Sequence, residues 1–261
     1  MPADLPQLLR RAVEDILQGI PAGEIAARAA ALSARYRGEV RDQRMHVAGP
    51  ADAAAYAAVR MPATYAATRA AMAAVAEAAP GFSPRRQLDV GSGPGTAAWA
   101  AAEAWDSLES VVAVEGSAAM AEAGRRFWAA RGPRPSLEWR AEDVEQAEPA
   151  PAGGFDLVTL AYVLNELRMD PGEAAARFWR RTEGVLLIVE PGTPAGWRRI
   201  LAARGALVAG GAHLAAPCPH AAACPLAPPD WCHFAQRVPR SREHRLAKGG
   251  ELGWEDEKFI Y

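Results

Sequence analysis

The sequence has little lysine, little cysteine and no long apolar run. Only two of its 29 basic residues are lysines, Lys248 and Lys258, so its positive charge is almost entirely arginine. The same bias accompanies much alanine, glycine and proline, as a genome-wide composition would produce, although arginine is also the better ligand for phosphate. No stretch approaches the roughly 18 unbroken apolar residues of a membrane span. The composition therefore predicts no membrane-spanning helix and leaves nucleic-acid binding open.

The N-terminus and the low cysteine content predict the cellular compartment. The stretch "MPADLPQLLRR" has an acid at Asp4 and no apolar core, so it predicts no signal peptide. With few cysteines and no export signal, we expect a cytoplasmic protein whose thiols stay reduced. A net charge of -2 gives no general attraction to nucleic acid or to a membrane. The 261 residues are enough for one large domain with an appendage.

The sequence pattern divides the chain into three parts. Apolar residues at helical spacing predict a helical N-terminal segment, 1–80, interrupted near Pro62. Strands then alternate with helices over 81–200, which predicts a parallel sheet covered on both faces. Beyond Pro191 the pattern is irregular, and 201–261 is predicted to form a small module that contains the cysteines and many arginines. The predicted strands are 87–90, 110–117, 155–164 and 183–191, and the predicted helices of the central part are 96–105, 117–131 and 171–182.

The stretch "LDVGSGPGT" joins the first of these strands to the first of these helices. Its glycines, Gly91, Gly93 and Gly95, let the backbone approach a ligand closely and leave helix N-terminal amides free to bind it. Glu115 ends the next strand, where an acid can accept hydrogen bonds from both hydroxyls of a ribose. The third glycine comes too early for the dinucleotide fingerprint. A nicotinamide cofactor and a turn without a ligand are therefore alternatives that this spacing does not favour.

The string D-x-G-x-G-x-G followed by an acid resembles motif I of the class I S-adenosylmethionine-dependent methyltransferases. "AEDVE" and "FDLVTLAYVLNEL" match later parts of those enzymes in the same order. The resemblance implies an α/β, Rossmann-like class I S-adenosylmethionine methyltransferase fold, with a helical N-terminal segment and a small Cys-rich C-terminal module. It implies that the cofactor-binding residues are Asp89, Gly91, Ser92, Gly93, Gly95, Glu115, Asp143 and Tyr162.

Cofactor binding alone does not establish methyl transfer. The turn "YVLNEL" lacks the Pro-Pro pair that often follows the fourth strand in amine methylation of bases, and it resembles the corresponding turn of small-molecule methyltransferases. Glu166 in this turn could act as a general base if burial raised its pKa, or it could cap a helix. The sequence therefore identifies no catalytic residue.

The three cysteines, Cys218, Cys224 and Cys232, stand within fifteen positions. Their C-x5-C-x7-C spacing differs from the C-x3-C-x2-C of radical S-adenosylmethionine enzymes and contains no C-x2-C pair typical of zinc ribbons. Two of them precede proline, as ligands of iron–sulfur clusters often do, and His220 and His233 lie beside them. Three thiols are one ligand short of a four-coordinate site and leave a disulfide pairing odd. The alternative is a loop with three cysteines that bind nothing.

A second resemblance covers nearly the whole chain. "EPGTPAGWRRILAARGAL", "PCPHAAACPL" and "DWCHFAQRVPRSREHRLAKGG" are similar to the Rsm family of methyltransferase-like assembly factors of the small ribosomal subunit, as are "RMPATYAA" and "LDVGSGPGTAAWAA". The resemblance implies that the three cysteines are ligands of a four-iron four-sulfur cluster, with zinc as the alternative metal. The family's fourth cysteine lies further downstream, and the sequence has none after Cys232. We therefore expect either a shortened chain or a last ligand from a histidine, a solvent molecule or a partner.

The stretch "QRVPRSREHRLAK" concentrates basic residues beside Trp231 and Phe234. Such a run can contact phosphates and stack on a base, or it can be a solvated basic face. The resemblance favours binding to ribosomal RNA. The candidate RNA-binding residues are Arg237, Arg240, Arg242, Arg245 and Lys248.

Together these patterns predict a methyltransferase-like protein that binds S-adenosylmethionine and ribosomal RNA. We expect it to associate with small-subunit precursors during ribosome assembly and translation. One alternative is an active small-molecule methyltransferase in which the cysteine module is a structural metal site. Another is an RNA-binding scaffold that has lost cofactor binding.

Overall fold

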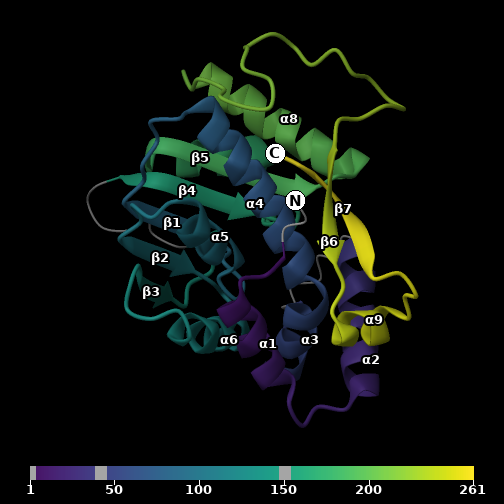
Figure 1. Ribbon diagram of the computed structural model, residues 1–261. Helices are drawn as coiled ribbons and strands as arrows, with labels where there is room; N and C mark the ends of the chain where they lie inside the picture. Colours follow the sequence, from purple (N-terminus) through teal and green to yellow (C-terminus); the bar gives the residue numbers. More distant parts are fainter. Residues whose placement is uncertain (1–3, 39–45, 147–153) are drawn as a thin grey trace.

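The computed structural model describes residues 4–38, 46–146 and 154–261, whose elements are labelled in Figure 1. The strands are β1 (Arg86–Val90), β2 (Ser110–Val114), β3 (Ser136–Arg140), β4 (Phe155–Ala161), β5 (Thr182–Pro191), β6 (Phe234–Pro239) and β7 (Trp254–Ile260). The helices are α1 (Gln7–Leu17), α2 (Ala22–Arg37), α3 (Pro50–Val59), α4 (Met61–Ala78), α5 (Thr96–Ala104), α6 (Ala118–Ala129), α7 (Pro171–Trp179), α8 (Pro194–Ala209) and α9 (Arg242–Lys248).

The strands form one seven-stranded sheet in the order β3-β2-β1-β4-β5-β7-β6 (Figure 1). Strands β1 to β5 are parallel, and β7 runs antiparallel to its neighbours β5 and β6. This is the strand order of class I methyltransferases, so the predicted Rossmann-like α/β fold is confirmed. The sequence pattern missed β3, whose side chains are exposed or half-buried because it lies at the edge of the sheet.

The connections between strands create a crevice at the centre of the sheet. The chain runs from β1 outward to β3 and then returns to β4 on the other side of β1. Consecutive crossovers on opposite sides of one strand leave an opening at the carboxyl ends of β1 and β4. Ligands of open α/β sheets bind at such a switch point, and the glycine turn follows β1 at this place.

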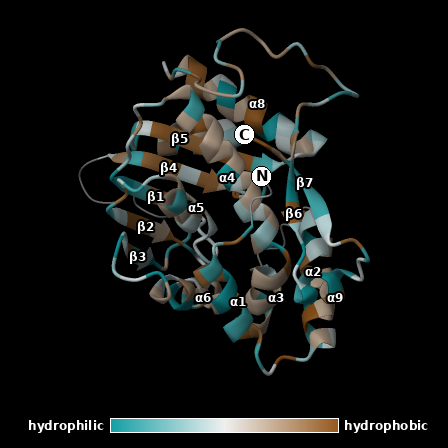
Figure 2. Ribbon diagram, viewed as in Figure 1, coloured by the Kyte–Doolittle hydropathy of each residue, from teal (hydrophilic) through white to brown (hydrophobic). Residues whose placement is uncertain are grey.

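Alternating side chains of the central strands enter two apolar layers, one on each face of the sheet. Leu157 and Leu187 join the layer that also contains helices α1 to α6. Val158 and Ile188 join the layer beneath α7 and α8. Because both faces are covered, β4 and β5 contain runs of apolar residues, seen as brown segments in Figure 2. Strand β1 also carries two buried polar residues, Gln87 and Asp89.

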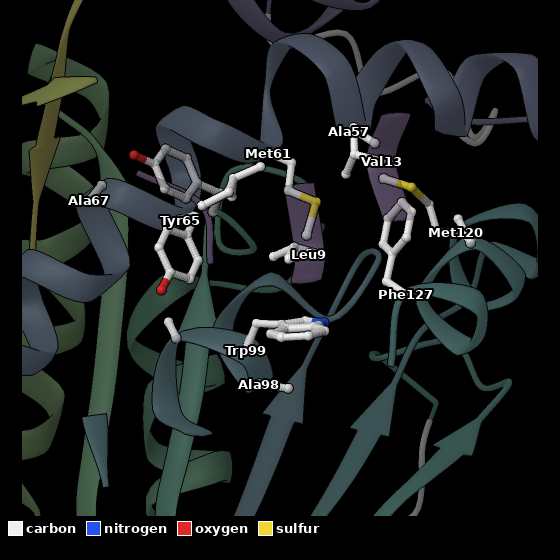
Figure 3. Packing of buried hydrophobic residues seen from close by; sticks show 14 of the residues in the cluster. Leu9, Val13, Ala57, Met61, Tyr65, Ala67, Ala98, Trp99, Met120 and Phe127 are labelled. Atoms are coloured by element: carbon white, nitrogen blue, oxygen red, sulfur yellow. The ribbon is translucent and has the colours of Figure 1, made fainter. Parts of the chain in front are cut away.

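The N-terminal helices form part of the core on the first of these faces. Leu9 of α1, Met61 of α4 and Trp99 of α5 are fully buried and lie together in Figure 3. The interruption expected near Pro62 is confirmed, because α3 ends at Val59 and α4 begins at Met61 with the proline in its first turn. Proline fits that position because the first amides of a helix need no partner within it.

The expectation of irregular structure beyond Pro191 was wrong for the next stretch, which is helix α8. Thr193 caps this helix by accepting a hydrogen bond from the Gly196 amide at 3.1 Å, and Pro194 occupies its first turn. These are the residue types that begin helices. Trp197 and Ala203 bury one side of the helix. The local signal for α8 was therefore present in the sequence.

The C-terminal elements complete the main sheet. β7 pairs with β5 at two positions and with β6 over residues 254–259, and α9 packs against α2 and α3. No Cys-rich module stands apart from the sheet among the residues that the structure describes. The division into 1–80, 81–200 and 201–261 stays a prediction, and its first part includes residues 1–3 and 39–45, outside the described ranges. In the described ranges, no helix is long and apolar enough to cross a membrane.

Candidate functional site

The turn after β1 depends on glycine. Gly91, Gly93 and Gly95 have φ angles of 59°, 55° and 80°, a region that residues with a Cβ rarely adopt. A Cβ at Gly91 would also lie only 2.7 Å from a methyl group of Val163. The turn therefore packs directly against the segment after β4 and exposes its backbone to the crevice.

Asp89, the residue two positions before Gly91, stabilises this turn. One carboxylate oxygen accepts a hydrogen bond from the Thr159 hydroxyl of β4 at 2.7 Å, and the other accepts one from the Ala98 amide of α5 at 3.2 Å. Burial raises the pKa of Asp89 to about 7, although both hydrogen bonds act in the opposite direction. Because the protein already uses both oxygens, Asp89 joins β1, β4 and α5 and positions the turn.

Glu115 follows β2 and reaches the same crevice. Its two oxygens accept hydrogen bonds from the Gly93 amide at 2.8 Å and the Ser117 amide at 2.7 Å. Burial raises the pKa of this carboxyl, while the two amides favour its charged form. A carboxylate has about four acceptor sites, so Glu115 is fixed in place and can still accept hydrogen bonds from a ligand.

A cavity of about 570 Å³ lies over these residues. Gly95 is not among the residues that line it and instead caps the start of α5. The remaining residues predicted for the cofactor do line it: Asp89, Gly91, Ser92, Gly93, Glu115, Asp143 and Tyr162. The structure thus brings them together at one place, and their contact with a cofactor stays a prediction.

Two hydroxyls in this cavity lack a partner. Ser92 and Thr96 are each 6% exposed, and within the described residues neither side-chain oxygen has a hydrogen bond. Buried polar atoms are nearly always paired in folded proteins. Beside the exposed backbone of the glycine turn, the unpaired hydroxyls fit a polar ligand such as the nucleoside and amino-acid portions of S-adenosylmethionine.

Tyr162 and Asp143 also make contacts within the protein that the sequence did not predict. Tyr162 is the only non-glycine residue of the described chain with positive φ, at 62°, and its hydroxyl donates to Glu257 of β7 at 3.0 Å. Burial and the neighbouring Glu257 raise the pKa of Tyr162 well above its usual range. Asp143 accepts a hydrogen bond from the Glu145 amide at 2.9 Å and forms part of the rim of the cavity.

The cavity is also lined by residues that the cofactor pattern did not include. Tyr36 of α2, Tyr56 of α3 and Thr64 of α4 line it, together with Glu166 from the turn after β4. Glu166 was considered from the sequence, but no local pattern distinguishes the two tyrosines. Only the packing of the N-terminal helices over the sheet places them there.

The three cysteines line a second, smaller cavity of about 150 Å³ between their loop, β5 and α8. Cys218 is exposed, whereas Cys224 and Cys232 are partly buried. Burial raises the pKa of the Cys232 thiol, and the thiols of Cys218 and Cys224 raise it further. The Arg204 guanidinium of α8 holds the loop by donating to the carbonyls of His220 and Ala222.

This arrangement fits a metal group only in part. The three thiols face one cavity, yet the described residues contain no group of three or more His, Cys, Asp or Glu side chains placed to hold a metal ion. A thiolate site needs its sulfurs about 2.3 Å from a zinc ion, in tetrahedral arrangement. The loop therefore brings the predicted ligands near one another without assembling a site.

The basic run is largely paired with acids of β7. Arg237 donates to both oxygens of Asp256, at 2.9 and 3.2 Å, and its guanidinium lies 3.7 Å from the centre of the Trp254 ring. Arg240 and Lys248 both bind Glu255, with shortest distances of 2.8 Å. Three of the five predicted RNA-binding residues are therefore engaged within the protein.

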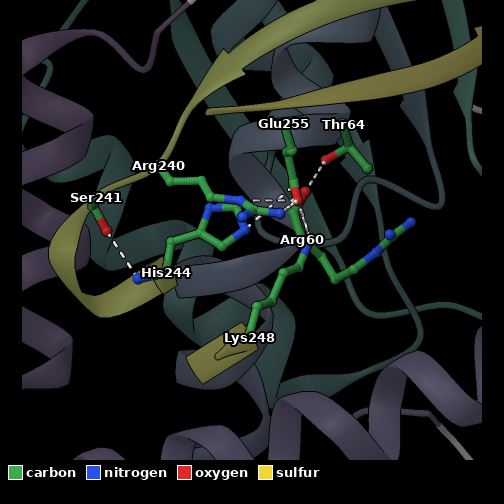
Figure 4. Close-up of polar contacts among 7 residues, drawn as sticks. All are labelled: Arg60, Thr64, Arg240, Ser241, His244, Lys248 and Glu255. Atoms are coloured by element: carbon green, nitrogen blue, oxygen red, sulfur yellow. Dashed lines mark hydrogen bonds and ion pairs between the residues drawn. The ribbon is translucent and has the colours of Figure 1, made fainter. Parts of the chain in front are cut away.

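Glu255 is the centre of this pairing (Figure 4). His244 is fully buried, and its Nε2 lies 3.3 Å from a Glu255 oxygen. Burial raises the pKa of Glu255, but the interactions with His244, Lys248 and Arg240 outweigh it and hold the pKa well below its usual range. The cluster joins α9 to the sheet.

Arg242 and Arg245 differ from the rest of the run. Both are exposed on α9, and neither side chain forms an ion pair or hydrogen bond with the described residues. They are the two predicted RNA-binding residues whose charge is available to a partner.

The fold and the cavity define a class I methyltransferase-like protein. Residues 50–261 match the family described as Mitochondrial small ribosomal subunit Rsm22. The chain therefore belongs to the Rsm22 family, as its cysteine and arginine motifs predicted.

Individual relatives match parts of the chain. It is 33% identical over 196 residues to the human protein named "Ribosome assembly protein METTL17, mitochondrial", which corresponds to 69% of this chain and 42% of that protein. The chain thus spans less than half the length of this relative. Among solved structures, SAM-bound CalS10, an amino pentose methyltransferase from Micromonospora echinaspora, is 23% identical with a TM-score of 0.39 over 51% of this chain and 52% of its own. Streptomyces venezuelae DesVI is 18% identical, also with a TM-score of 0.39, over 68% and 58%.

The two neighbouring acids of β7 allow a matched test of the Glu255 cluster. E255Q leaves Arg240 and Lys248 without an acceptor of opposite charge, so we expect it to lower the free energy of unfolding by about 1–3 kcal/mol, below the full value for buried pairs because the cluster is partly open to solvent. D256N removes only the exposed pair with Arg237 and should leave the melting temperature almost unchanged. Urea denaturation and melting curves of both variants measure this, and equal losses would contradict it.

The Glu255 cluster also predicts how the stability of the protein changes with pH. The folded-state pKa of Glu255 lies below its ordinary value of 4.5, so its stabilisation is complete above that value and is lost as the pH falls. E255Q should therefore differ most from the parent near neutral pH and least in acid.

Proposed function

We propose that the protein binds S-adenosylmethionine in the cavity at the end of β1 and acts in assembly of the small ribosomal subunit by contacting its RNA. One observation supports the cofactor part of this proposal. The glycine turn, Glu115 and the unpaired hydroxyls of Ser92 and Thr96 lie together at the switch point of the sheet. Membership of the Rsm22 family and the name of the human relative, a ribosome assembly protein, support the ribosomal part. A cytoplasmic location stays a prediction from the sequence.

The residues of the cavity have distinct tasks in this proposal. Glu115 would accept hydrogen bonds from the ribose hydroxyls, and Asp143 would lie near the base. Ser92, Thr96 and the backbone of the glycine turn would bind the remaining polar groups of the cofactor. Bound S-adenosylmethionine supplies a methyl group on a positively charged sulfur, and the acidic lining favours that charge. Binding and assembly do not by themselves require methyl transfer.

The cofactor proposal is tested by calorimetry with S-adenosylhomocysteine. E115Q removes the charged acceptor of the ribose hydroxyls, and we expect it to weaken binding about 10- to 100-fold, because hydrogen bonds to charged groups contribute roughly 1.5–3 kcal/mol. E122Q is the matched control, since Glu122 is an exposed residue of α6 outside the cavity. Equal affinity of the parent and E115Q would contradict the assignment.

The ribosomal proposal rests on the exposed arginines of α9. We expect the double variant R242A/R245A to lose most of its association with small-subunit precursors in sedimentation. The slope of log affinity against log salt should fall by about 1–2, because each phosphate contact contributes roughly 0.7 on single-stranded RNA. R126A/R134A replaces two arginines that are also exposed and should bind as the parent does. Unchanged association of R242A/R245A, with turnover on a small acceptor, would favour a small-molecule methyltransferase instead.

We also propose that the cysteine loop holds a metal group, with a four-iron four-sulfur cluster expected first and zinc as the alternative. The support is the shared cavity of the three thiols and the family motif that contains them. Because the ligands are close but not assembled, loading would order the loop around the metal, as metal binding does in other small sites.

Anaerobic reconstitution tests this proposal. The protein is incubated with iron and sulfide, or with zinc, and its metal content and visible absorption are measured. We expect C224S to lose the bound metal, while H213A, which changes an exposed histidine outside the second cavity, keeps it. Equal metal content in the parent and C224S would overturn the assignment.

A further inference from the structure

Gly95 belongs to the glycine turn and has a positive φ, yet it does not line the cavity. Its side without a Cβ faces Trp139 of β3. A Cβ at Gly95 would lie 3.4 Å from the ring carbon Cη2 and 3.5 Å from Cζ2 of that indole, which is close van der Waals contact. One residue of the cofactor motif thus lies against the edge strand of the sheet.

Gly124 of α6 leaves the space that the Trp139 ring occupies. Gly124 is buried in the interior of the helix. A Cβ at this position would overlap the Cη2 and Cζ2 atoms of Trp139 and would lie 3.1 Å from the carbonyl carbon of Pro94 in the turn. Glycine weakens a helix interior, but here it lets the edge of the indole fit between the α6 backbone and the turn.

Helix α6 meets the glycine turn at a second point. Met120, labelled in Figure 3, precedes Gly124 by four residues and so shares its face of the helix. A Cβ at Gly93 would lie 3.8 Å from the Met120 methyl carbon Cε. One face of α6, completed by the Trp139 ring, therefore supports the turn from Gly93 to Gly95.

Strand β3, beside α6 in Figure 1, also fixes the backbone of Glu115. The Glu115 amide donates to the carbonyl of Arg140, the residue after Trp139, at 3.0 Å. The Glu115 side chain in turn accepts from the Gly93 amide at 2.8 Å. The last two residues of β3 thus act on both sides of this hydrogen bond, on the acid through the backbone and on the turn through the indole.

We propose that Trp139, seated against Gly124, is a positioning residue of the cofactor site. It sets the distance between the glycine turn and Glu115, and so the spacing of the two groups assigned to the cofactor. The inference rests on the proposed cofactor site, because a ligand that contacts both groups is sensitive to that spacing. Trp139 is not among the residues that line the cavity, so it acts through the turn.

Amide hydrogen exchange of the ligand-free protein tests this positioning without a cofactor. W139F removes the part of the ring that reaches the turn and introduces no clash. We expect residues 91–96 to exchange about tenfold faster in W139F, because a less supported turn opens more often. W254F shortens an exposed ring of β7 and should leave the exchange of these residues unchanged.

Calorimetry with S-adenosylhomocysteine measures the consequence for binding. We expect W139F and G124A each to weaken binding about tenfold, as when one hydrogen bond to the ligand is lost. G205A is the matched control, since Gly205 also stands in a helix interior and a Cβ there meets nothing within 4 Å. The alanine methyl can occupy space that W139F vacates. The double variant G124A/W139F should therefore lose about tenfold, and not the roughly hundredfold of two independent changes.

Unchanged exchange in W139F, or full affinity in both single variants, would overturn the proposal. Losses that multiply in the double variant would mean that the two residues act separately, and would overturn it as well. If G124A does not fold, W139F alone decides, with a melting curve to establish that it is folded at the temperature of the measurement. Failure of the parent to bind S-adenosylhomocysteine would instead overturn the cofactor proposal, while the exchange rates still decide whether Trp139 holds the turn.

Discussion

The hydrogen bonds of Asp89 are the constraint on which the cavity depends. Asp89 stands opposite Thr159 in the pairing of β1 with β4, and its carboxylate also binds the first turn of α5 through the Ala98 amide. Three elements that are distant in sequence are thereby fixed around one side chain. The glycine turn can keep its left-handed backbone because this support holds both of its ends.

Three further carboxylates in or next to the cavity differ in the hydrogen bonds that they accept from the protein. Glu190 is fully buried, accepts from the Leu164 amide at 3.0 Å and pairs with Arg199 at 3.3 Å, so it supports the turn that carries Glu166. Glu115 is held by two amides and faces the ligand side. Glu166 is held by none within the described chain. An acid in this fold is therefore available for chemistry to the extent that backbone donors do not already occupy it.

The sequence was sufficient where a local pattern determines the structure. The glycine spacing and Glu115 located the crevice, and strand–helix alternation predicted the sheet. It was insufficient where contacts form between distant segments: no local signal places Tyr36 in the cavity. In the same way, the arginine run gave the charge but not the acids that neutralise Arg237 and Arg240, because those acids lie on a neighbouring strand. Helix α8 is a different case, because its start does have a local signal in the sequence, namely Thr193 and Pro194.

The alternation of side chains along β7 links two of these places. Glu255 and Glu257 lie two residues apart and so share one face of the strand; the first binds the α9 cluster and the second binds Tyr162 at the cavity wall. A shift of β7 by one position against β6 would turn both acids to the other face at once. The pairing register of this strand therefore affects both the electrostatics of α9 and the wall of the cavity, because the two acids depend on the same register.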